Sequence, residues 1–229
     1  MAHYPVFLEL TGRRCLVVGL GRVGRRKLEG LLECGPAQVT GLDIRPPDSD
    51  IQRLLDSRAN FSFLQRPFRA EDVLGQTLVF ACSSDAGLNA EVAETCRLRG
   101  VWCNVADDPD QSDFILPSLI RRGDLVVAVS TSGRSPALAR MVRQELDEMF
   151  GPGYEPLLTV MGRIREGVLS CGTDCDQNRD LFRALVGSEL RRQLEIGDLA
   201  GADRTLRQVL PEVLHPEIGV YLHGSGKNF

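Results

Sequence analysis

The sequence predicts an α/β fold: a parallel-sheet domain over residues 1–112, a hairpin-plus-helix segment over 113–151, and an α-helical C-terminal domain over 152–229. Two observations predict this division. Short apolar runs alternate with segments of helical period up to Asp107, and beyond it the pattern changes to one hairpin and then to helices. Strands that alternate with helices imply right-handed crossovers, and therefore a parallel sheet. Fully apolar strands fit a sheet that is covered on both faces.

The composition excludes several classes of protein. With 229 residues, 43% of them hydrophobic and 25% charged, the chain matches neither a disordered nor a fibrous protein. The formal net charge of -4 gives no global field for nucleic acid or anionic lipid, so an anionic ligand needs a local basic cluster. No apolar run reaches the roughly 18 residues of a membrane span, and the first ten residues carry no secretory pattern. The seven irregularly spaced cysteines favour a reduced, cytoplasmic protein.

Five strands and three helices are expected in the first domain. After the first apolar run, apolar residues recur at helical spacing until Gly35, which acts as a stop signal. A second, short helix turns Ile51 inward, and a third ends at Gly100. The expected strands are residues 15–18, 39–44, 61–64, 78–82 and 101–105.

The chain beyond Asp107 follows a different pattern. Residues 114–120 and 125–129 are apolar runs on either side of a polar turn, which predicts an antiparallel hairpin. Ser135 and Pro136 are an N-cap and first-turn pair that opens a helix. After that helix only helical periods follow. Its apolar stripe consists of Leu138, Met141, Val142, Leu146 and Met149.

A glycine-rich turn follows the first strand. Residues 19–24 read GLGRVG and match the pattern G-x-G-x-x-G. The match alone is weak, but here a strand ends at Val18 and a helix begins near Arg22, as in dinucleotide-binding domains. The first glycine permits the tight turn, the second lets the backbone approach a pyrophosphate, and the third lets the helix pack on the strand. The competing interpretation is a turn that needs glycine for its own conformation.

An acidic residue ends the second strand, about 20 residues beyond the glycines. Asp43 would accept hydrogen bonds from the adenosine ribose and repel a 2′-phosphate, so the sequence favours NAD over NADP. Arg45 lies nearby and weakens that preference. In the competing interpretation, Asp43 only solvates the end of a strand.

Three further segments leave two interpretations open. Asp107 follows the fifth strand, where the ligands of parallel sheets collect, but residues 107–110 (DDPD) also read as an ordinary turn. Four polar residues follow the fourth strand and would cap the next helix, touch the cofactor, or do both: Ser83, Ser84, Asp85 and Asn89. Residues 130–136 (STSGRSP) form either a capped turn or an anion cradle at a helix start.

No metal site is predicted. Cys171 and Cys175 have metal-like spacing, but a structural zinc site needs four ligands, and none of the three histidines lies near them. The sequence also lacks the nucleophile elbow of hydrolases, the P-loop lysine motif and H-E-x-x-H.

Several blocks, taken in order, resemble the precorrin-2 dehydrogenase family, which includes the N-terminal module of siroheme synthase and the yeast bifunctional dehydrogenase–ferrochelatase. The blocks are residues 4–7 (YPVF), 17–27 (VVGLGRVGRRK), 81–85 (ACSSD) with Asn89, 103–107 (CNVAD), 113–118 (DFILPS) and 129–136 (VSTSGRSP). Two positions depart from the family pattern, because Leu20 replaces the usual middle glycine and Ser84 stands where an acidic residue is common. Neither removes a glycine that the phosphate turn needs, so we expect cofactor binding to survive.

The resemblance implies a Rossmann-type domain, a hairpin-plus-helix segment that builds a homodimer, and a helical C-terminal domain. It implies NAD-dependent oxidation of precorrin-2 to sirohydrochlorin, with insertion of Fe²⁺ or Co²⁺ as an additional activity of some members. The catalytic aspartate of the family corresponds by motif to Asp107, which favours a proton acceptor over a simple turn at that position. The implied partners are an upstream methyltransferase that supplies precorrin-2 and a separate chelatase.

The predicted site residues form two binding groups around the catalytic Asp107. The cofactor-binding residues are Gly19, Gly21, Arg22, Val23, Gly24, Asp43, Ser83, Ser84 and Asn104. Because the substrate bears many carboxylates, it needs local cations and polar groups. The substrate-binding residues are Thr131, Ser132, Arg134, Arg140 and Arg121.

Two other classes of function compete with this enzyme. An NAD-binding regulatory or sensor module would bind the cofactor without turnover and would need no role for Asp107. A generic small-molecule dehydrogenase would oxidise simple alcohols or hydroxy acids and leave a tetrapyrrole unchanged.

Overall fold

The computed structural model describes the backbone of residues 3–170 and 175–224, and all of their side chains except those of 175 and 176. Its internal contacts divide the chain into two units, residues 1–116 and 117–229. The finer division at residues 112 and 151 stays a prediction. In the described residues, no helix is both long enough and apolar enough to cross a bilayer.

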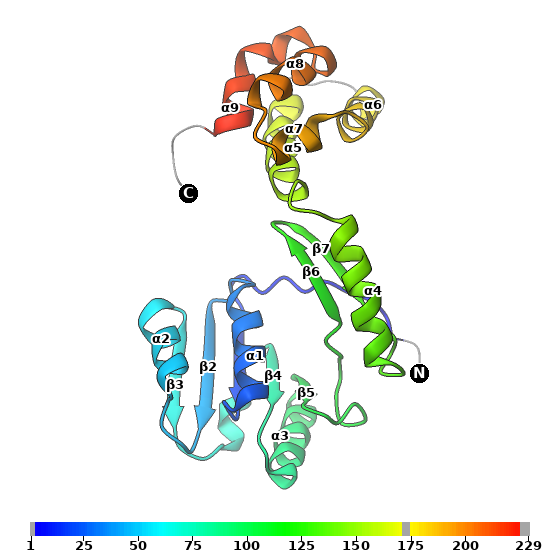
Figure 1. Cartoon of the computed structure of the whole chain (residues 1–229). Coiled ribbons are helices and arrows are strands. Elements are labelled where there is room, and N and C mark those ends of the chain that lie inside the picture. The colour runs from blue at the N-terminus through cyan, green and yellow to red at the C-terminus, as the bar shows by residue number, and fades with distance from the viewer. Residues whose placement is uncertain (1–2, 171–174, 225–229) are drawn as a thin grey trace. The chain divides into compact units, whose positions relative to one another are not determined.

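A five-stranded parallel sheet organises the first unit (Figure 1). Its strand order is β3-β2-β1-β4-β5. Strands β2 and β3 are therefore added on one side of β1, and the chain then crosses back to place β4 and β5 on the other side. This is the order of a Rossmann sheet, whose ligands bind beyond the carboxyl ends of the strands where the order reverses. The strands are β1 (Arg14–Val18), β2 (Gln38–Asp43), β3 (Phe61–Gln65), β4 (Leu78–Ala81) and β5 (Trp102–Val105).

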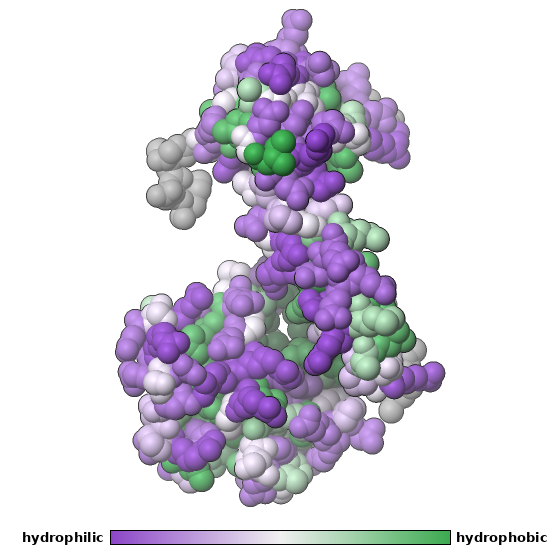
Figure 2. Space-filling view, viewed as in Figure 1, coloured by the Kyte–Doolittle hydropathy of each residue, from purple (hydrophilic) through white to green (hydrophobic). Residues whose placement is uncertain are grey.

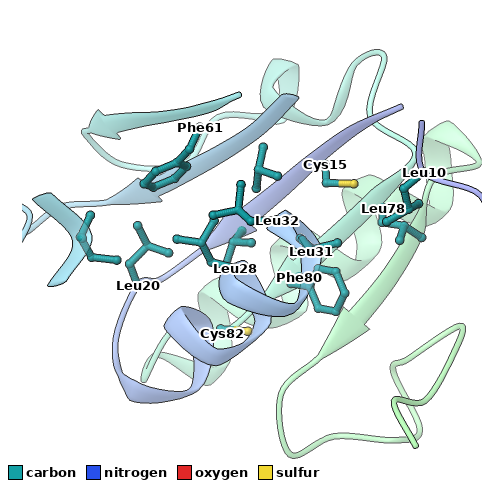
Figure 3. Close-up of a cluster of buried hydrophobic side chains, with 13 residues drawn as sticks. Leu10, Cys15, Leu20, Leu28, Leu31, Leu32, Phe61, Leu78, Phe80 and Cys82 are labelled. Carbon is teal, nitrogen blue, oxygen red and sulfur yellow. The ribbon is translucent and has the colours of Figure 1, made fainter. Parts of the chain in front are cut away.

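Helices cover both faces of this sheet, as the fully apolar strands predict. Alternate residues of β1 enter opposite layers: Cys15 packs with Leu28 and Phe80 in one cluster, which Figure 3 shows, while Leu16 packs with Val92 in the other. Successive side chains of a strand point to opposite faces, so both layers bury β1. The helical elements are α1 (Arg22–Leu32), α2 (Ser49–Ser57), the 3₁₀ turn η1 (Ala70–Val73) and α3 (Ala86–Arg99).

The predicted stop at Gly100 and the inward position of Ile51 are confirmed, whereas α1 ends at Leu32, before the predicted stop at Gly35. Ile51 of α2 is buried at 2% exposure. Helix α3 ends at Gly100, whose φ of 67° is the left-handed conformation that glycine adopts without strain. The side chain of Asp85 begins the same helix, since it accepts hydrogen bonds from the backbone N–H groups of Gly87 and Leu88. Helix α1 is joined to the start of α2 by Arg25, which pairs with Asp48 and Asp50.

Element boundaries differ from the prediction by one or two residues. The second strand ends at Asp43, which pairs with Gln65, and the apolar Ile44 beyond it is 69% exposed. The fifth strand begins at Trp102 rather than at Val101. The predicted bounds follow the apolar residues of each run, but a strand ends where its hydrogen bonds to the neighbouring strand end.

The hairpin of the second unit begins later than expected. Strands β6 (Ser118–Arg122) and β7 (Leu125–Val129) are antiparallel, and Arg122 faces Leu125 across a two-residue turn. The predicted start at residue 114 is wrong, because Phe114 belongs to the first unit. Its ring meets that of Phe80 edge-on at a centroid distance of 5.5 Å, and its carbonyl accepts a hydrogen bond from Asn104.

Helices make up the rest of the second unit, as predicted. Helix α4 (Pro136–Met149) begins at Ser135, whose hydroxyl accepts a hydrogen bond from the N–H of Leu138 at 3.2 Å, so the predicted N-cap is confirmed. Ile164, Leu185 and Leu206 lie fully buried in the core of the helices beyond α4. Those helices are α5 (Tyr154–Ser170), α6 (Cys175–Val186), α7 (Leu190–Glu195), α8 (Leu199–Val209), the 3₁₀ helix η2 (Glu212–Glu217) and α9 (Ile218–His223).

Candidate functional site

The glycine turn joins the end of β1 to the start of α1. Gly19 has a φ of 85°, a conformation that residues with a side chain rarely adopt. Its N–H donates to the carbonyl of Leu42 at 2.7 Å. A Cβ on Gly19 would lie 2.7 Å from the backbone nitrogen of Ser83 and 2.8 Å from the carbonyl of Cys82. The turn therefore packs directly against the chain that leaves β4.

The other two glycines of the motif have different surroundings. A Cβ on Gly24 would lie 1.8 Å from the carbonyl oxygen of Gly19, so this glycine lets α1 pack on the turn. A Cβ on Gly21 would meet nothing closer than the Arg45 guanidinium at 3.7 Å. The space beside Gly21 is therefore open, as the approach of a pyrophosphate requires.

The N-terminus of α1 presents backbone N–H groups that no described side chain caps. Helices α2, α3 and α4 begin with Asp48, Asp85 and Ser135, whose side chains accept hydrogen bonds from first-turn N–H groups. Helix α1 begins after Gly21 and has neither a capping side chain nor an acidic residue in its first turn. Such free N–H groups, at the positive end of the helix dipole, bind phosphate. The predicted Arg22 and Val23 are the first two residues of this helix.

Asp43 ties β2 to the glycine turn. Its carboxylate accepts hydrogen bonds from the backbone N–H of Leu20 at 2.8 Å and of Arg45 at 2.9 Å, and the Arg45 guanidinium lies 3.4 Å away. Burial acts to raise the pKa of Asp43, but these backbone donors and the guanidinium outweigh burial and lower the pKa. A carboxylate has about four acceptor positions, so acceptor capacity remains for the ribose hydroxyls of a dinucleotide.

Replacing Asp43 with asparagine is expected to cost about 1–3 kcal/mol of unfolding free energy at neutral pH, because one buried donor loses its charged acceptor. A carboxyl whose pKa is lowered in the folded state stabilises the protein at pH values above the pKa that it has in the unfolded chain. This stabilisation is lost as the pH falls through the pKa of the folded state. The difference between wild type and Asp43→Asn should therefore shrink below about pH 4. Urea denaturation of both proteins at pH 7 and pH 3 measures this difference in unfolding free energy. An equal difference at the two pH values would contradict the account.

Asp107 borders a pocket of about 150 Å³ that opens beyond the end of β5. Its φ is 62°, and among the described residues other than glycine only Asp107 and Ser132 have a positive φ. A side chain held there costs about 1–3 kcal/mol, and such strain clusters at functional sites. The Asp107 carboxylate is exposed and forms no hydrogen bond or ion pair with any described residue. It is thus free to act on a ligand.

Two cationic residues also line this pocket, although no role was predicted for either of them. They are Arg26 and Lys27 of α1, and the Lys27 ammonium lies 6.0 Å from the centroid of the Phe80 ring. The predicted cofactor contact Asn104 also lines the pocket, and its amide donates to the Phe114 carbonyl at 2.8 Å. Because Arg26 and Lys27 follow Val23 by three and four residues, the sequence could have shown that all three share one side of α1. It could not have shown that a pocket lies beside that side.

The loop after β4 is held by Asn89, one of the four polar residues noted there in the sequence. The side chain of Asn89 accepts from the N–H of Ser83 and donates to its carbonyl, at 3.0 and 2.9 Å. The Ser83 hydroxyl accepts from the N–H of Asp85. The predicted cap of α3 is confirmed at Asp85, neither serine caps the helix, and Ser84 is exposed. Contact of these serines with a cofactor stays a prediction.

The predicted substrate residues belong to the second unit. The Thr131 hydroxyl donates to the Ser135 carbonyl and accepts from its N–H, at 3.0 and 3.2 Å, as in a capped turn. Ser132 has a φ of 52°, and Arg134 and Arg140 are exposed. Arg121 lies in β6 opposite Val126. Binding of an anion by this segment stays a prediction.

The described cysteines do not form a reactive or metal-binding group. Cys15, Cys82, Cys96 and Cys103 are buried free thiols. Burial raises the pKa of the Cys82 thiol to about 11, which keeps it neutral. Within the described residues, no three His, Cys, Asp or Glu side chains cluster as metal ligands do. Cys171 and the side chain of Cys175 lie outside those residues.

Comparison with known proteins finds matches for both units. Residues 6–118 match the family described as putative NAD(P)-binding, and residues 122–149 match the family described as sirohaem biosynthesis protein central. The siroheme synthase of Nitrosomonas eutropha is 33% identical over 99% of this chain and 48% of its own length. Siroheme synthase 2 of Klebsiella pneumoniae subsp. pneumoniae is 34% identical over 99% of this chain and 49% of its own length. The chain is therefore similar to siroheme synthases along nearly all of its own length.

These matches confirm the resemblance seen in the sequence blocks and the prediction of a dinucleotide-binding domain. The chain spans about half the length of the siroheme synthases that it matches. A solved structure described as "SirC, precorrin-2 dehydrogenase" superposes with a TM-score of 0.72 and 21% identity, over 90% of this chain and 98% of that one. That match confirms the predicted fold class, a Rossmann-type sheet followed by a helical region.

Proposed function

We propose that this chain is an NAD-dependent precorrin-2 dehydrogenase that forms sirohydrochlorin. The observation that carries the proposal is the combination, within one unit, of an uncapped glycine-turn helix and an unpartnered carboxylate. The helix begins after Gly21 with free N–H groups. The carboxylate is that of Asp107, held in a left-handed backbone conformation at the edge of a pocket.

The residues of the first unit fit a dinucleotide in this position. The open side of Gly21 and the first turn of α1 would hold the pyrophosphate, and Asp43 would accept the adenosine ribose hydroxyls. Because Asp43 would also repel a 2′-phosphate, we propose NAD as the cofactor. When bound, NAD supplies the acceptor for the hydride that precorrin-2 loses.

Asp107 would take the proton that precorrin-2 loses together with the hydride. A general base must present a free acceptor to its substrate, and the Asp107 carboxylate has no partner among the described residues. Insertion of Fe²⁺ or Co²⁺ into sirohydrochlorin stays a prediction. Adding either metal to purified sirohydrochlorin with this protein, and subtracting the spontaneous rate, tests it.

We propose a homodimer built by the hairpin and α4. Three residues of the predicted stripe on α4 are at least 46% exposed: Leu138, Met141 and Met149. Figure 2 shows apolar side chains exposed over this helix. An exposed apolar stripe of this kind is typical of an interaction surface. We further propose a cytoplasmic location and a separate methyltransferase that supplies precorrin-2.

Mixing the protein with NAD and enzymatically made precorrin-2 is expected to produce NADH, followed at its absorbance band. Neither component alone should give a signal. NAD binding without NADH formation would reject the dehydrogenase and favour a regulatory module. Activity with simple alcohols or hydroxy acids, and none with precorrin-2, would favour a generic dehydrogenase instead.

A further inference from the structure

Lysine is rare in this chain, and one lysine lines the pocket of Asp107. Of the 27 cationic side chains, 25 are arginines, and the two lysines are Lys27 and Lys227. Lys227 lies outside the described residues. A chain that uses arginine almost everywhere, yet has lysine at position 27, suggests that this position needs the compact ammonium. Arginine cannot replace it where a small, point-like charge is required.

The side chain of Lys27 is placed to present its charge to the pocket. Lys27 lies in the second turn of α1 and is partly buried. Its ammonium lies 6.0 Å from the centroid of the Phe80 ring, at the outer limit of a cation–π contact. Lys27 lines the pocket of about 150 Å³ together with Asn104 and Asp107. A pocket of this size has room for a carboxylate group but not for a whole tetrapyrrole.

This ammonium forms no close ion pair with any described residue. No ion pair within 4.0 Å joins Lys27 to a described carboxylate, whereas Arg25, two positions earlier, pairs with Asp48 and Asp50. Burial lowers the pKa of Lys27, an effect that the nearby Cys82 and Asp107 oppose and that Arg26 reinforces. A partly buried cation without a close anion is costly, and an anionic ligand would offset that cost.

The acidic residues of the pocket do not replace such a ligand. The Asp108 carboxylate is occupied, because it accepts hydrogen bonds from the backbone N–H and the side-chain amide of Gln111, at 3.2 and 2.7 Å. Asp107 is the candidate proton acceptor and must stay free for the substrate. The exposed guanidinium of Arg26, which also lines the pocket, adds a second positive charge at its rim.

We propose that Lys27 binds a carboxylate group of the substrate in the pocket that it shares with Asp107. This inference rests on the proposed function, and it adds a substrate-binding ammonium to the unit that holds the cofactor. The bound carboxylate would fix the position of the tetrapyrrole relative to Asp107. The position requires a lysine, because the longer, planar guanidinium of an arginine would fill the pocket that the carboxylate needs.

Three variants of the full chain test this role. Lys27→Met keeps an unbranched apolar stem over Phe80 and removes the charge. Lys27→Arg keeps the charge and changes its shape. Arg99→Met removes one exposed cation from α3, outside the pocket, and controls for the change in net charge.

For Lys27→Met we expect the KM for precorrin-2 to rise about tenfold or more, as loss of a charged hydrogen bond predicts, with kcat changed less than KM. The dissociation constant of sirohydrochlorin, measured by fluorescence titration, should rise in parallel, while NAD affinity and melting temperature stay at wild-type values. Arg99→Met should behave as wild type, and Lys27→Arg should remain close to Lys27→Met.

Each contrary result has a separate meaning. Wild-type KM and sirohydrochlorin affinity in Lys27→Met would overturn the proposal while leaving the dehydrogenase intact. Full recovery in Lys27→Arg would overturn the requirement for an ammonium. If Arg99→Met weakened binding of precorrin-2 and sirohydrochlorin equally, the effect would come from net charge alone, and the proposed subsite would be overturned. A wild-type protein that neither oxidises precorrin-2 nor binds sirohydrochlorin would reject the proposed function itself.

Discussion

Replacing Asp107 with asparagine is expected to lower turnover of precorrin-2 by a factor of about 10²–10⁴, the usual loss when a general base is removed. Asparagine is the informative substitute, because it tolerates the left-handed backbone that Asp107 adopts, with its φ of 62°. The substitution removes the proton acceptor and leaves the turn intact. Steady-state NADH formation from precorrin-2 measures the loss.

The matched control is Asp110→Asn, which removes an exposed carboxylate from the same loop but outside the pocket. This variant should keep wild-type turnover. Both variants should keep wild-type NAD affinity and melting temperature. Equal turnover in Asp107→Asn and wild type would remove Asp107 from the catalytic role.

Replacing Gly24 with alanine is expected to lower the unfolding free energy by about 3 kcal/mol or more, at the upper end of the cost of overpacking. The new Cβ would lie 1.8 Å from the carbonyl oxygen of Gly19, so α1 must move away from the turn. NAD affinity should fall together with stability, because the same movement displaces the N–H groups of the helix. Urea denaturation and NAD titration measure the two effects.

Two further glycines of this region separate packing from binding. Gly30→Ala lies on α1 with no atom within 4 Å of the new Cβ, so it should raise stability by about 0.5–1 kcal/mol and leave NAD affinity unchanged. Gly21→Ala meets only Arg45 at 3.7 Å, so it should fold normally but bind NAD about tenfold more weakly or worse. Wild-type NAD affinity in Gly21→Ala would contradict the placement of the pyrophosphate beside this glycine.

The sheet and its helices could be predicted from the sequence because apolar periodicity records burial. Leu16 and Cys15 lie on opposite faces of β1, and both are buried, so the run is apolar throughout. The N-cap at Ser135 and the stop at Gly100 follow from local chemistry that the sequence contains directly. These features depend on a residue and its near neighbours.

Features that depend on distant contacts could not be predicted. Phe114 reads as the start of a strand, but its ring packs on Phe80, a contact that no local pattern records. Lys27 reads as a solvated helix residue, and its place in the pocket depends on the loop beyond β5. The strained backbone of Asp107 is likewise a property of the folded loop. The position of the glycine turn could therefore be predicted, whereas the placement of Arg26 and Lys27 beside the pocket could not.

The structure of the protein crystallised with NAD is the most direct test of the central claim, that the coenzyme lies on the glycine turn with its reactive ring facing Asp107. We expect the pyrophosphate beside Gly21 at the N-terminus of α1, the adenosine ribose at Asp43, and the nicotinamide ring directed toward the Asp107 carboxylate. An empty glycine turn, or a nicotinamide directed away from Asp107, would contradict it.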